Sequence, residues 1–338
     1  MPIELRSDTF TKPSEGMLHA MMTAEVGDDV FNEDPTVKKL EQLAANYFGM
    51  QASLFCPSGT MTNQIAIKCH TKPGNEVICE KLSHVYIYEG GGIAFNSGCQ
   101  VKPIEGDRGR LSPEDVLNAI NPDDIHKPVS SLISIENTSN RNGGSYYQLD
   151  DLEEIKRICL NNNIKYHLDG ARLWNAIVAN DEDPKFYGKT FDSISVCLSK
   201  GLGAPVGSLL LGNYDFIHEA KRIRKVFGGG MRQAGYLAAA GIYALENNIN
   251  RLKEDHHHAK LIGQALINKD FVSKILPIET NIIIFEVQGQ FTAASFCDYL
   301  KNRDVYAMAI APNQVRMVTH LDVTNNMIDQ LLDIINKM

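Results

Sequence analysis

A lysine and an aspartate stand at the ends of two successive strand-like segments, where together they could serve a carbonyl cofactor. The apolar run 191–198 leads into Ser-Lys-Gly-Leu-Gly, so that Lys200 begins a glycine turn, and Asp169 ends the preceding strand-like run, 164–169. An amine can form a Schiff base with the aldehyde of pyridoxal phosphate (PLP), and a carboxylate can keep its pyridine nitrogen protonated. The pair therefore predicts a PLP site.

Two further segments offer the other groups that PLP needs. Ser58, Gly59 and Thr60 follow the short apolar run 53–56 and begin a helix, whose free N–H groups and dipole favour a phosphate. Taken alone, these residues are more simply interpreted as an ordinary helix cap. His84 follows the run 76–79, where an imidazole can stack on a pyridine ring or move protons, although a lone histidine is more often a capping or surface residue.

Arginines at three positions could hold anionic groups. Arg172 comes three residues after Asp169 and could bind a carboxylate or a phosphate. Arg316, in the run 315–320, could close a bidentate clamp on an α-carboxylate. Arg232 follows three glycines, a pattern that fits either a phosphate-contacting loop or a flexible hinge. Each residue has a structural alternative, and only their order along one chain favours the functional interpretation.

The elements that must position these residues alternate between strands and helices. Helical spacing of apolar residues predicts helices at 35–48, 61–69 and 152–160, and apolar runs predict strands at 53–56, 76–79, 99–104, 130–136 and 206–211. This alternation predicts an α/β fold with a mostly parallel sheet covered on both faces and a ligand at the carboxyl ends of its strands.

The end of the chain has a different pattern. After an Ala-rich helix from 233 to about 248, the sequence reads helix, strand (281–286), helix, strand (315–318) and helix. We expect a large PLP-binding domain at 1–250, which includes the N-terminal segment, and a small C-terminal α+β domain at 251–338.

Composition argues against several classes of protein. The chain has 338 residues, a net charge of −8 and no basic run, which disfavours nucleic acid as a partner. Its seven cysteines form no CxxC pair, so neither zinc nor a disulfide framework is expected, and free thiols suit the cytosol. We find no secretory signal and no membrane-spanning segment, and we expect a cytoplasmic protein. Asp255–His258 look metal-like, but consecutive helical residues point in different directions, so we interpret them as a solvated helix and expect no metal site.

Taken in order, the motifs resemble the low-specificity L-threonine aldolases, a group of PLP fold-type I (aspartate aminotransferase-like) enzymes within the wider β-eliminating lyase family. The similarity runs along nearly the whole chain. The segments that carry it are Leu5-Arg6-Ser7-Asp8-Thr9, Gly27-Asp28-Asp29-Val30, Asp34-Pro35-Thr36-Val37, Pro57-Ser58-Gly59-Thr60, His84, Glu136-Asn137-Thr138, Asp169-Gly170-Ala171-Arg172-Leu173, Ser199 to Pro205, Gly228 to Gln233, and Val315 to His320.

The resemblance implies a role for each matching residue. Lys200 would be the Schiff-base lysine, Asp169 the partner of the pyridinium nitrogen, and His84 the stacking residue. The other cofactor contacts would come from Ser58, Gly59, Thr60, Arg172 and Arg232. The substrate carboxylate would be held by Ser7, Arg172 and Arg316. His126 matches a second active-site histidine near the β-hydroxyl group, and Lys225 and Arg232 match residues that relatives contribute across a dimer interface.

The reaction implied by the resemblance is a carbon–carbon lyase reaction, the PLP-dependent cleavage of a β-hydroxy amino acid. L-threonine or L-allo-threonine would give glycine and acetaldehyde, in glycine formation and threonine breakdown, with His84, His126 or a water between them as the base. The family implies a homotetramer built from dimers that share active sites. Two departures are Phe31 in place of a common tyrosine and Ser139 in place of a common histidine, and the segment Arg141 to Ser145 also differs from the family pattern. These changes bear on substrate preference more than on catalysis.

Three alternatives remain open at this stage. A β-eliminating lyase or an enzyme similar to serine hydroxymethyltransferase would use the same residues to break another bond or to use folate. A non-catalytic PLP-fold protein is disfavoured because both Lys200 and Asp169 are present. A dehydrogenase of doubly wound fold is disfavoured because no GxGxxG follows the first strand.

Overall fold

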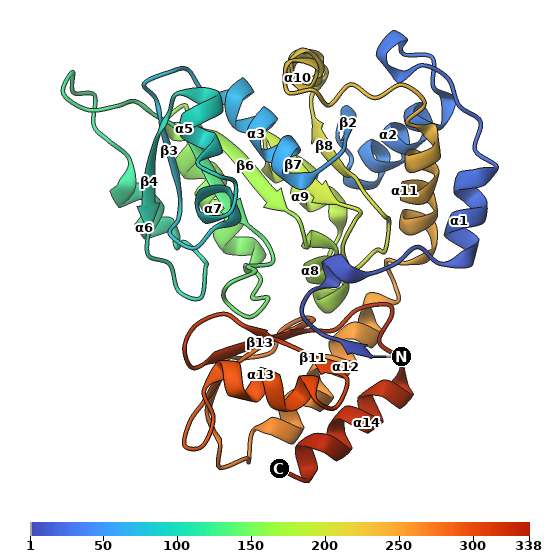
Figure 1. The fold of residues 1–338 in the computed structure, drawn as a ribbon. Coiled ribbons are helices and arrows are strands. Elements are labelled where there is room, and N and C mark those ends of the chain that lie inside the picture. The colour runs from blue at the N-terminus through green and yellow to red at the C-terminus, as the bar shows by residue number, and fades with distance from the viewer. Residues whose placement is uncertain (1) are drawn as a thin grey trace.

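The computed structural model describes residues 2–338 as two lobes, shown one above the other in Figure 1. We call the elements from η1 to α11 the large lobe, and β1 together with α12 to α14 the small lobe. The large lobe is built on a seven-stranded sheet with the order β2-β8-β7-β6-β5-β3-β4. Strands β4, β3, β5, β6 and β7 are parallel, and β8 is antiparallel to both of its neighbours. The predicted α/β class and mostly parallel sheet are confirmed.

The strands of this sheet agree closely with the apolar runs of the sequence. They are β2 (Ala52–Cys56), β3 (Glu76–Glu80), β4 (Gln100–Ile104), β5 (Ser130–Glu136), β6 (Lys165–Gly170), β7 (Ser193–Cys197) and β8 (Ser208–Gly212). The inner strands are buried along nearly their whole length because helices cover both faces of the sheet.

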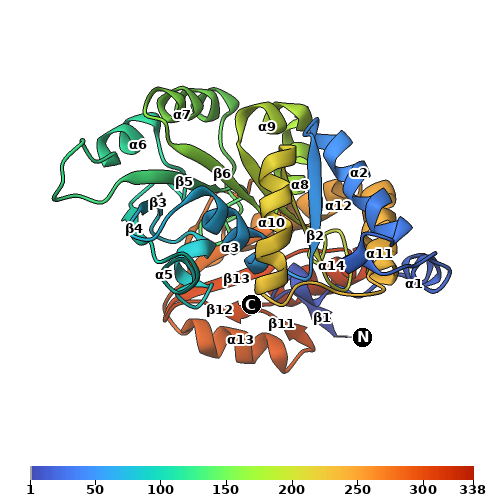
Figure 2. The ribbon, with the colours of Figure 1, turned by 90° about the horizontal axis from the view of Figure 1, so that it is seen from above.

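Helices α3, α5 and α10 cover one face of the sheet, and α2, α7 and α9 cover the other (Figure 2). The helices of the large lobe are α1 (Glu15–Met22), α2 (Pro35–Phe48), α3 (Gly59–His70), α4 (His84–Ile87), α5 (Gly92–Ser97), α6 (Pro113–Ala119), α7 (Leu149–Asn161), α8 (Leu173–Asn180), α9 (Pro184–Thr190), α10 (Tyr214–Val226) and α11 (Gly235–Asn247), with short 3-10 helices η1 (Asp8–Phe10) and η2 (Asp29–Phe31).

Helix α2 shows how local sequence sets an element. Asp34 caps its first turn by accepting a 2.9 Å hydrogen bond from the Val37 N–H, and Pro35 occupies the first turn, where no amide hydrogen is needed. Gly49 ends the helix in the left-handed conformation, with φ of 65°. The apolar face between these signals is buried in the main core, so the predicted bounds, 35–48, match the observed ones.

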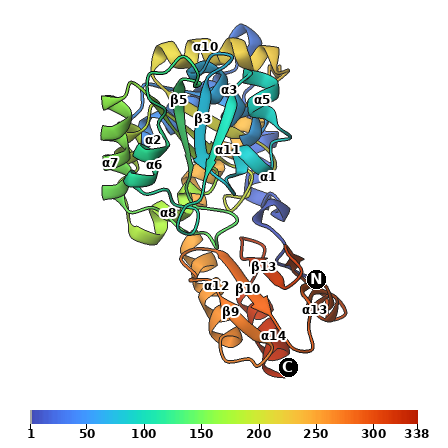
Figure 3. The ribbon, with the colours of Figure 1, turned by 90° about the vertical axis from the view of Figure 1, so that its left-hand side faces the viewer.

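The small lobe has its own sheet and core. It comprises α12 (Leu252–Leu266), β9 (Val272–Ile275), β10 (Ile282–Val287), α13 (Ala293–Lys301), β11 (Val305–Tyr306), β12 (Met308–Ala309), β13 (Gln314–Val318) and α14 (Asn325–Asn336). The antiparallel sheet has the order β12-β13-β10-β9. Strand β1 (Ile3–Glu4) pairs in parallel with β11, and Ile3 and Leu5 join the small core. The N-terminal segment accordingly lies beside the small lobe in Figure 3. Residues 3–5, expected with the large domain, therefore pack in the small lobe.

The structure corrects the interpretation of the histidine-rich segment in α12, which was expected from the sequence to be solvated. Asp255, His256 and His258 are buried rather than solvated. Asp255 forms an ion pair with Arg251, while His256 and His258 are hydrogen-bonded to asparagine side chains of α8 and α14. This part of α12 is therefore packed between α8 and α14, and these three side chains do not have the expected contact with solvent. Among residues 2–338, no helix has the length and apolar composition that crossing a membrane requires.

Candidate active site

Four polar residues lie at or just beyond the carboxyl ends of neighbouring parallel strands. His84 begins α4 after β3, Glu136 ends β5, Asp169 lies near the end of β6, and Lys200 follows β7. Because β3, β5, β6 and β7 are parallel, these ends share one edge of the sheet. This is the edge at which open α/β sheets bind their ligands.

A cavity of about 380 Å³ lies at this edge, with walls from both lobes. Five residues predicted from the sequence line it: Ser7, His84, Arg172, Lys200 and Arg316. Ser7 caps η1, His84 begins α4, and Arg172 immediately precedes α8. Lys200 lies in the turn between β7 and β8, and Arg316 belongs to β13. The fold thus gathers residues that are up to about three hundred positions apart in the chain into one cavity.

Lys200 is positioned by a hydrogen-bonded turn. The Leu198 N–H donates to the Gly207 carbonyl at 3.0 Å, and the Gly203 N–H donates to the Lys200 carbonyl at 2.8 Å. The same carbonyl accepts a 3.0 Å hydrogen bond from the Thr11 hydroxyl. Gly203 adopts a φ of 78°, which favours glycine at this point. The backbone of Lys200 is therefore fixed, and its amine remains free to react in the cavity.

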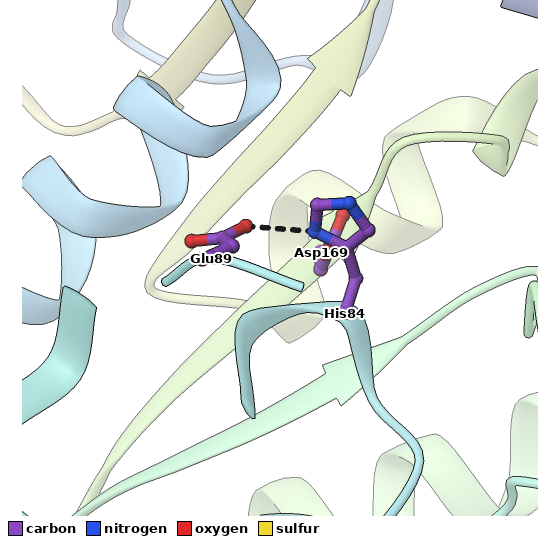
Figure 4. A group of neighbouring side chains, drawn as sticks. All are labelled: His84, Glu89 and Asp169. Atoms are coloured by element: carbon purple, nitrogen blue, oxygen red, sulfur yellow. Dashed lines mark hydrogen bonds and ion pairs between the residues drawn. The ribbon is translucent and has the colours of Figure 1, made fainter. Parts of the chain in front are cut away.

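His84, Glu89 and Asp169 form a compact cluster (Figure 4), with one ligand-type atom of each lying within 4.8 Å of the others. His84 Nδ1 is 2.9 Å from Glu89 Oε1. The Asn63 amide donates to Glu89 Oε1 and to Asp169 Oδ2, both at 2.9 Å. The Ala171 N–H donates to the other oxygen of Asp169 at 3.1 Å. Donors on both oxygens fix the position of the Asp169 carboxylate, which suits pairing with a pyridinium nitrogen.

His84 and the neighbouring Glu136 have shifted pKa values. Burial opposes protonation of His84, but its hydrogen bond to Glu89 and the charge of Asp169 outweigh burial and raise the pKa of the imidazole. Burial, together with the charge of Asp169, raises the pKa of Glu136 to about 7, although its carboxylate accepts hydrogen bonds from the backbone of His84 and Asn140. Titration near neutral pH in a cavity is typical of a site that moves protons.

The arginines of the cavity have different partners. Arg172 donates through Nε and Nη2 to both oxygens of Asp8, at 2.8 and 2.7 Å. Burial alone would raise the pKa of Asp8, but the Arg172 charge and hydrogen bonds lower it to about 2. The Asn140 side-chain oxygen accepts from Nη1 of Arg316 at 2.9 Å and from Nη1 of Arg172 at 3.3 Å. Two guanidinium groups therefore converge on one oxygen, as they would on a carboxylate.

Arg316 is only partly satisfied. Its Nη2 donates to the Arg6 carbonyl at 3.0 Å, whereas its buried Nε has no hydrogen-bond partner within residues 2–338. Burial lowers the pKa of Arg316 to about 10. A buried cation with an unused donor is costly unless an anion joins it, so Arg316 is prepared for an anionic ligand.

The N-terminus of α3 lies beside the end of β7. Ser58 caps the helix by accepting from the Met61 N–H at 3.2 Å, and Ser58 and Thr60 are exposed. A Cβ on Gly59 would lie 2.7 Å from Cys197 Sγ, so glycine permits this close approach. The first N–H groups of α3 and the Ser58 and Thr60 hydroxyls can hold a phosphate. Together with the amine, carboxylate and imidazole of the cavity, this cradle fits PLP.

The structure does not bring every predicted residue to the cavity. The His126 side chain is 84% exposed and is paired with Asp124. His126 comes four positions before the start of β5, so it lies near the amino ends of the strands. Arg232 pairs with Asp28 at 2.8 Å, and its guanidinium lies over the Phe31 ring. Lys225 lines a separate cavity beside α10. The roles predicted for His126, Arg232 and Lys225 stay predictions.

Several residues of the site were missed by reasoning from the sequence. These are Asp8, Asn63, Glu89, Asn140 and Arg141, which either line the cavity or hold the residues that do. Asp8 is next to Ser7, and Glu89 comes five positions after His84, so each was adjacent to a predicted residue. Nothing in the spacing of Asn63 identifies it, because its partners Glu89 and Asp169 come from other elements.

Comparison with known proteins places the chain among PLP enzymes. A family model described as "Beta-eliminating lyase" matches residues 4–290. The low specificity L-threonine aldolase of Escherichia coli (strain K12) is 44% identical over 330 residues, which are 97% of each chain. Among solved structures, a threonine aldolase from Leishmania major has a TM-score of 0.87 and 20% identity and covers 99% of both chains. SPT solved with PLP has a TM-score of 0.78 and 16% identity, over 99% of this chain and 87% of that one. These last two similarities establish the fold.

Proposed function

This chain belongs to the beta-eliminating lyase family, and we propose that it is a PLP-dependent carbon–carbon lyase that cleaves L-threonine and L-allo-threonine to glycine and acetaldehyde. The observation that carries the proposal is the single cavity in which Lys200, His84 and Arg316 meet beside Asp169. Each of these residues matches one part of the cofactor or of a β-hydroxy amino acid.

The substrate carboxylate binds where Arg172 and Arg316 converge. In the free protein the Asn140 oxygen lies between the two guanidinium groups, and a carboxylate oxygen would take that position or share it. Because Asp8 already occupies two donors of Arg172, Arg316 supplies most of the attraction, through its unused Nε. Fixing the carboxylate orients the Cα–Cβ bond, which is worth a large part of the rate enhancement.

His84 is the base for the β-hydroxyl proton. It lines the cavity, whereas His126 lies at the other edge of the sheet in this chain. Glu89 holds His84 Nδ1, so Nε2 is the nitrogen left to accept the proton. Removing the hydroxyl proton turns the C–O bond into the aldehyde carbonyl as the Cα–Cβ bond breaks, and Cα gains a proton to give glycine.

Lys200, Asp169 and the start of α3 would hold the cofactor. Lys200 binds its aldehyde, Asp169 pairs with its ring nitrogen, and Ser58, Gly59 and Thr60 receive its phosphate. Bound PLP supplies the electron sink for the pair of electrons released from the Cα–Cβ bond. Asn63 holds the Asp169 carboxylate in place, which maintains its pairing with the ring nitrogen.

The test is an assay of products from purified protein with PLP. Acetaldehyde and glycine are measured with L-threonine and with L-allo-threonine, and pyruvate is measured with L-serine. We expect acetaldehyde and glycine in equal amounts from both threonine isomers and little pyruvate from serine. Pyruvate formation without acetaldehyde would instead support a β-eliminating lyase, the second candidate, which uses the same cofactor residues.

Replacing Lys200 tests the cofactor site separately. Lys200→Ala should abolish acetaldehyde release and the visible absorbance of covalently held PLP, because no other lysine lines the cavity within residues 2–338. Lys221→Ala, an exposed lysine on α10, serves as the control and should keep both properties. Full aldolase activity in a colourless Lys200→Ala protein would overturn the assignment.

Finer properties belong to the same proposal. The protein acts in the cytoplasm, in glycine formation and threonine breakdown, as a homotetramer whose dimers share active sites, and it needs neither nucleic acid nor a membrane. In such a dimer, Lys225 and Arg232 of one subunit complete the cofactor site of the other, and His126 could reach it. The division into domains at 250/251 is part of this proposal, since α11 ends at Asn247 and α12 begins at Leu252.

A further inference from the structure

Three arginines line the substrate cavity, but only one of them has a carboxylate partner. Arg172 forms its ion pair with Asp8 at 2.7 Å. Neither Arg316 nor Arg141 lies within 4.0 Å of a carboxylate oxygen in the part of the chain that the structure describes, residues 2–338. In both, the Nε atom is buried and has no hydrogen-bond partner. The cavity therefore contains two guanidinium charges that the protein itself does not neutralise.

Arg141 is placed in the cavity by a fixed backbone. It follows β5 in a turn closed by two 2.9 Å hydrogen bonds, from the Ser139 N–H to the Ser145 carbonyl and from the Gly144 N–H to the Ser139 carbonyl. The Thr280 hydroxyl donates to the Gly144 carbonyl at 2.8 Å, which ties the turn to the small lobe. The turn is thus held at both of its ends, and the Arg141 side chain, half-buried, stays at the cavity wall.

The α-carboxylate of an amino acid accounts for only one of the two unpaired charges. Arg172 and Arg316 converge on the Asn140 oxygen, which marks the position of that carboxylate. Arg141 forms no hydrogen bond to Asn140 or to any other described residue, so it does not belong to this group. The site proposed for the cofactor phosphate is separate from Arg141 and lies at the start of α3, beside Cys197. Arg141 is therefore left with no partner from the substrate backbone or from the cofactor.

We infer that Arg141 binds an acidic group on the side chain of the substrate, so that the enzyme also cleaves β-hydroxy amino acids with a second carboxylate on Cβ, such as 3-hydroxyaspartate. This inference rests on the proposed aldol cleavage. The chemistry is unchanged: the hydroxyl proton goes to the base, the Cα–Cβ bond breaks, and Cα gains a proton. The products are glycine and glyoxylate, and no oxidant or reductant is needed. The remaining wall, formed by Met308 and Ile310, still accommodates the methyl group of threonine.

The experiment compares two substrates in three proteins. We measure kcat/KM for 3-hydroxyaspartate, as glyoxylate release, and for L-threonine, as acetaldehyde release, in the wild type, in Arg141→Met and in Arg157→Met. Methionine keeps much of the length and apolar stem of arginine without its charge. Arg157, exposed on α7, is the control for the loss of one positive charge elsewhere on the molecule.

In Arg141→Met we expect kcat/KM for 3-hydroxyaspartate to fall roughly 10- to 100-fold more than kcat/KM for threonine, the effect of losing one charge-assisted hydrogen bond. Arg157→Met should leave both values unchanged. An equal loss on the two substrates in Arg141→Met, or no glyoxylate release by the wild type, would overturn the inference. Failure of the wild type to cleave threonine would instead contradict the proposed function, so the two failures are distinguishable.

Ligand binding gives a measurement that does not depend on turnover. L-aspartate has a carboxylate on Cβ but no hydroxyl group, and L-alanine has neither. Both dissociation constants are measured from the change in the visible absorbance of the holoenzyme. We expect Arg141→Met to weaken L-aspartate binding by roughly tenfold or more relative to L-alanine. Equal weakening of both ligands, or loss of PLP from the variant, would show that Arg141 serves the cofactor or the fold and would overturn the inference.

Discussion

At the scale of single residues, Glu89 controls the protonation of His84. Its carboxylate accepts from His84 Nδ1 and stabilises the protonated ring, which raises the pKa of His84. A base must be unprotonated to accept the β-hydroxyl proton, so activity should rise as the pH rises through the pKa of His84. Glu89→Gln removes the negative charge and lowers that pKa. We therefore expect the acid limb of the kcat/KM profile to move to lower pH, with a lower plateau because the imidazole becomes a weaker base.

The control for this experiment is Glu105→Gln, which neutralises an exposed glutamate paired with Lys81 outside the cavity. Its pH profile should match that of the wild type. The Glu89→Gln side chain keeps an oxygen for Asn63 and His84, and the neighbouring Gln64 amide can rotate to accept from its new NH₂ group. An acid limb that stays at its original pH in Glu89→Gln would contradict the assignment of His84 as the base.

Asn63 acts through its two carboxylate partners. It donates to Asp169 and Glu89, so Asn63→Ala removes a donor from the oxygen of Asp169 that it holds. The Asp169 carboxylate is then held less firmly and pairs less well with the cofactor ring. We expect kcat to fall roughly 10-fold, with KM for threonine little changed. Loss of a residue that orients a reactive group without touching the substrate typically has an effect of this size.

A control exists in a half-buried amide that also donates to a carboxylate. Asn121 donates to Glu76 at 2.9 Å at the other edge of the sheet. Asn121→Ala should lower the melting temperature by a similar amount without a specific effect on kcat. If Asn63→Ala and Asn121→Ala reduced kcat equally after correction for the folded fraction, Asn63 would have a purely structural role.

Three of the residues predicted from the sequence share one property, which is that each lies beside a recognisable strand end. Lys200, Asp169 and His84 follow apolar runs, and the direction of a parallel sheet then brings them together. Asn63 and Asn140 show the limit of this reasoning. Their roles depend on the rotation of a helix and the path of a turn, which bring them against partners from other elements and leave no mark in local spacing.

At the scale of elements, the first turn of α3 combines two roles in one residue. Ser58 caps the helix and is also one of the residues proposed to hold the phosphate. Ser14 caps α1 in the same way, through a hydrogen bond from Met17, away from the cavity. Ser58→Ala and Ser14→Ala should each lower the free energy of unfolding by about 1 kcal/mol. Only Ser58→Ala should weaken PLP binding, roughly tenfold, since it alone removes a hydroxyl donor to a dianion.

Thermal unfolding of the cofactor-free proteins and titration with PLP separate the two effects. Equal PLP affinity in the two variants would place the phosphate elsewhere than the start of α3. The main helices and strands themselves were predictable because caps, glycine stops and apolar periodicity agree, as in α2. The antiparallel direction of β8 was not, because an apolar run such as 206–211 has the same composition in either direction.

At the scale of the whole molecule, the chain joins the two lobes at two places, by its N-terminal segment and by the link between α11 and α12. Strand β1 adds to β11 of the small lobe, and Ser7 and Asp8 then lead back into the cavity. The sequence did not predict that the N-terminal segment passes from the small lobe to the cavity. The strand that fixes it has two residues, too few to show an alternation of apolar and polar positions. The consequence is functional, since the N-terminal segment brings Asp8 to Arg172 and so sets how that arginine can meet a substrate.

The exposed surface of the large lobe supports the proposed dimer with shared sites. Large apolar side chains are exposed there on α1, η2, α10 and α11: Leu18, Met22, Phe31, Val226 and Tyr236. Arg232 lies over the ring of one of them, Phe31, and its ion pair is with Asp28. Several exposed apolar groups on one lobe are typical of a surface that a second copy covers. Arg232 would then reach the site of the neighbouring subunit.

Subunit mixing tests whether Arg232 acts across an interface. Lys200→Ala and Arg232→Ala should each be inactive alone, since one lacks the amine and the other lacks the cofactor contact. After unfolding and refolding together in equal amounts, half of the dimers contain one subunit of each kind, and one of their two sites is intact. We therefore expect about a quarter of wild-type activity to return. If the refolded mixture stays inactive while refolded wild type recovers, Arg232 serves its own subunit or none, and the shared site is wrong.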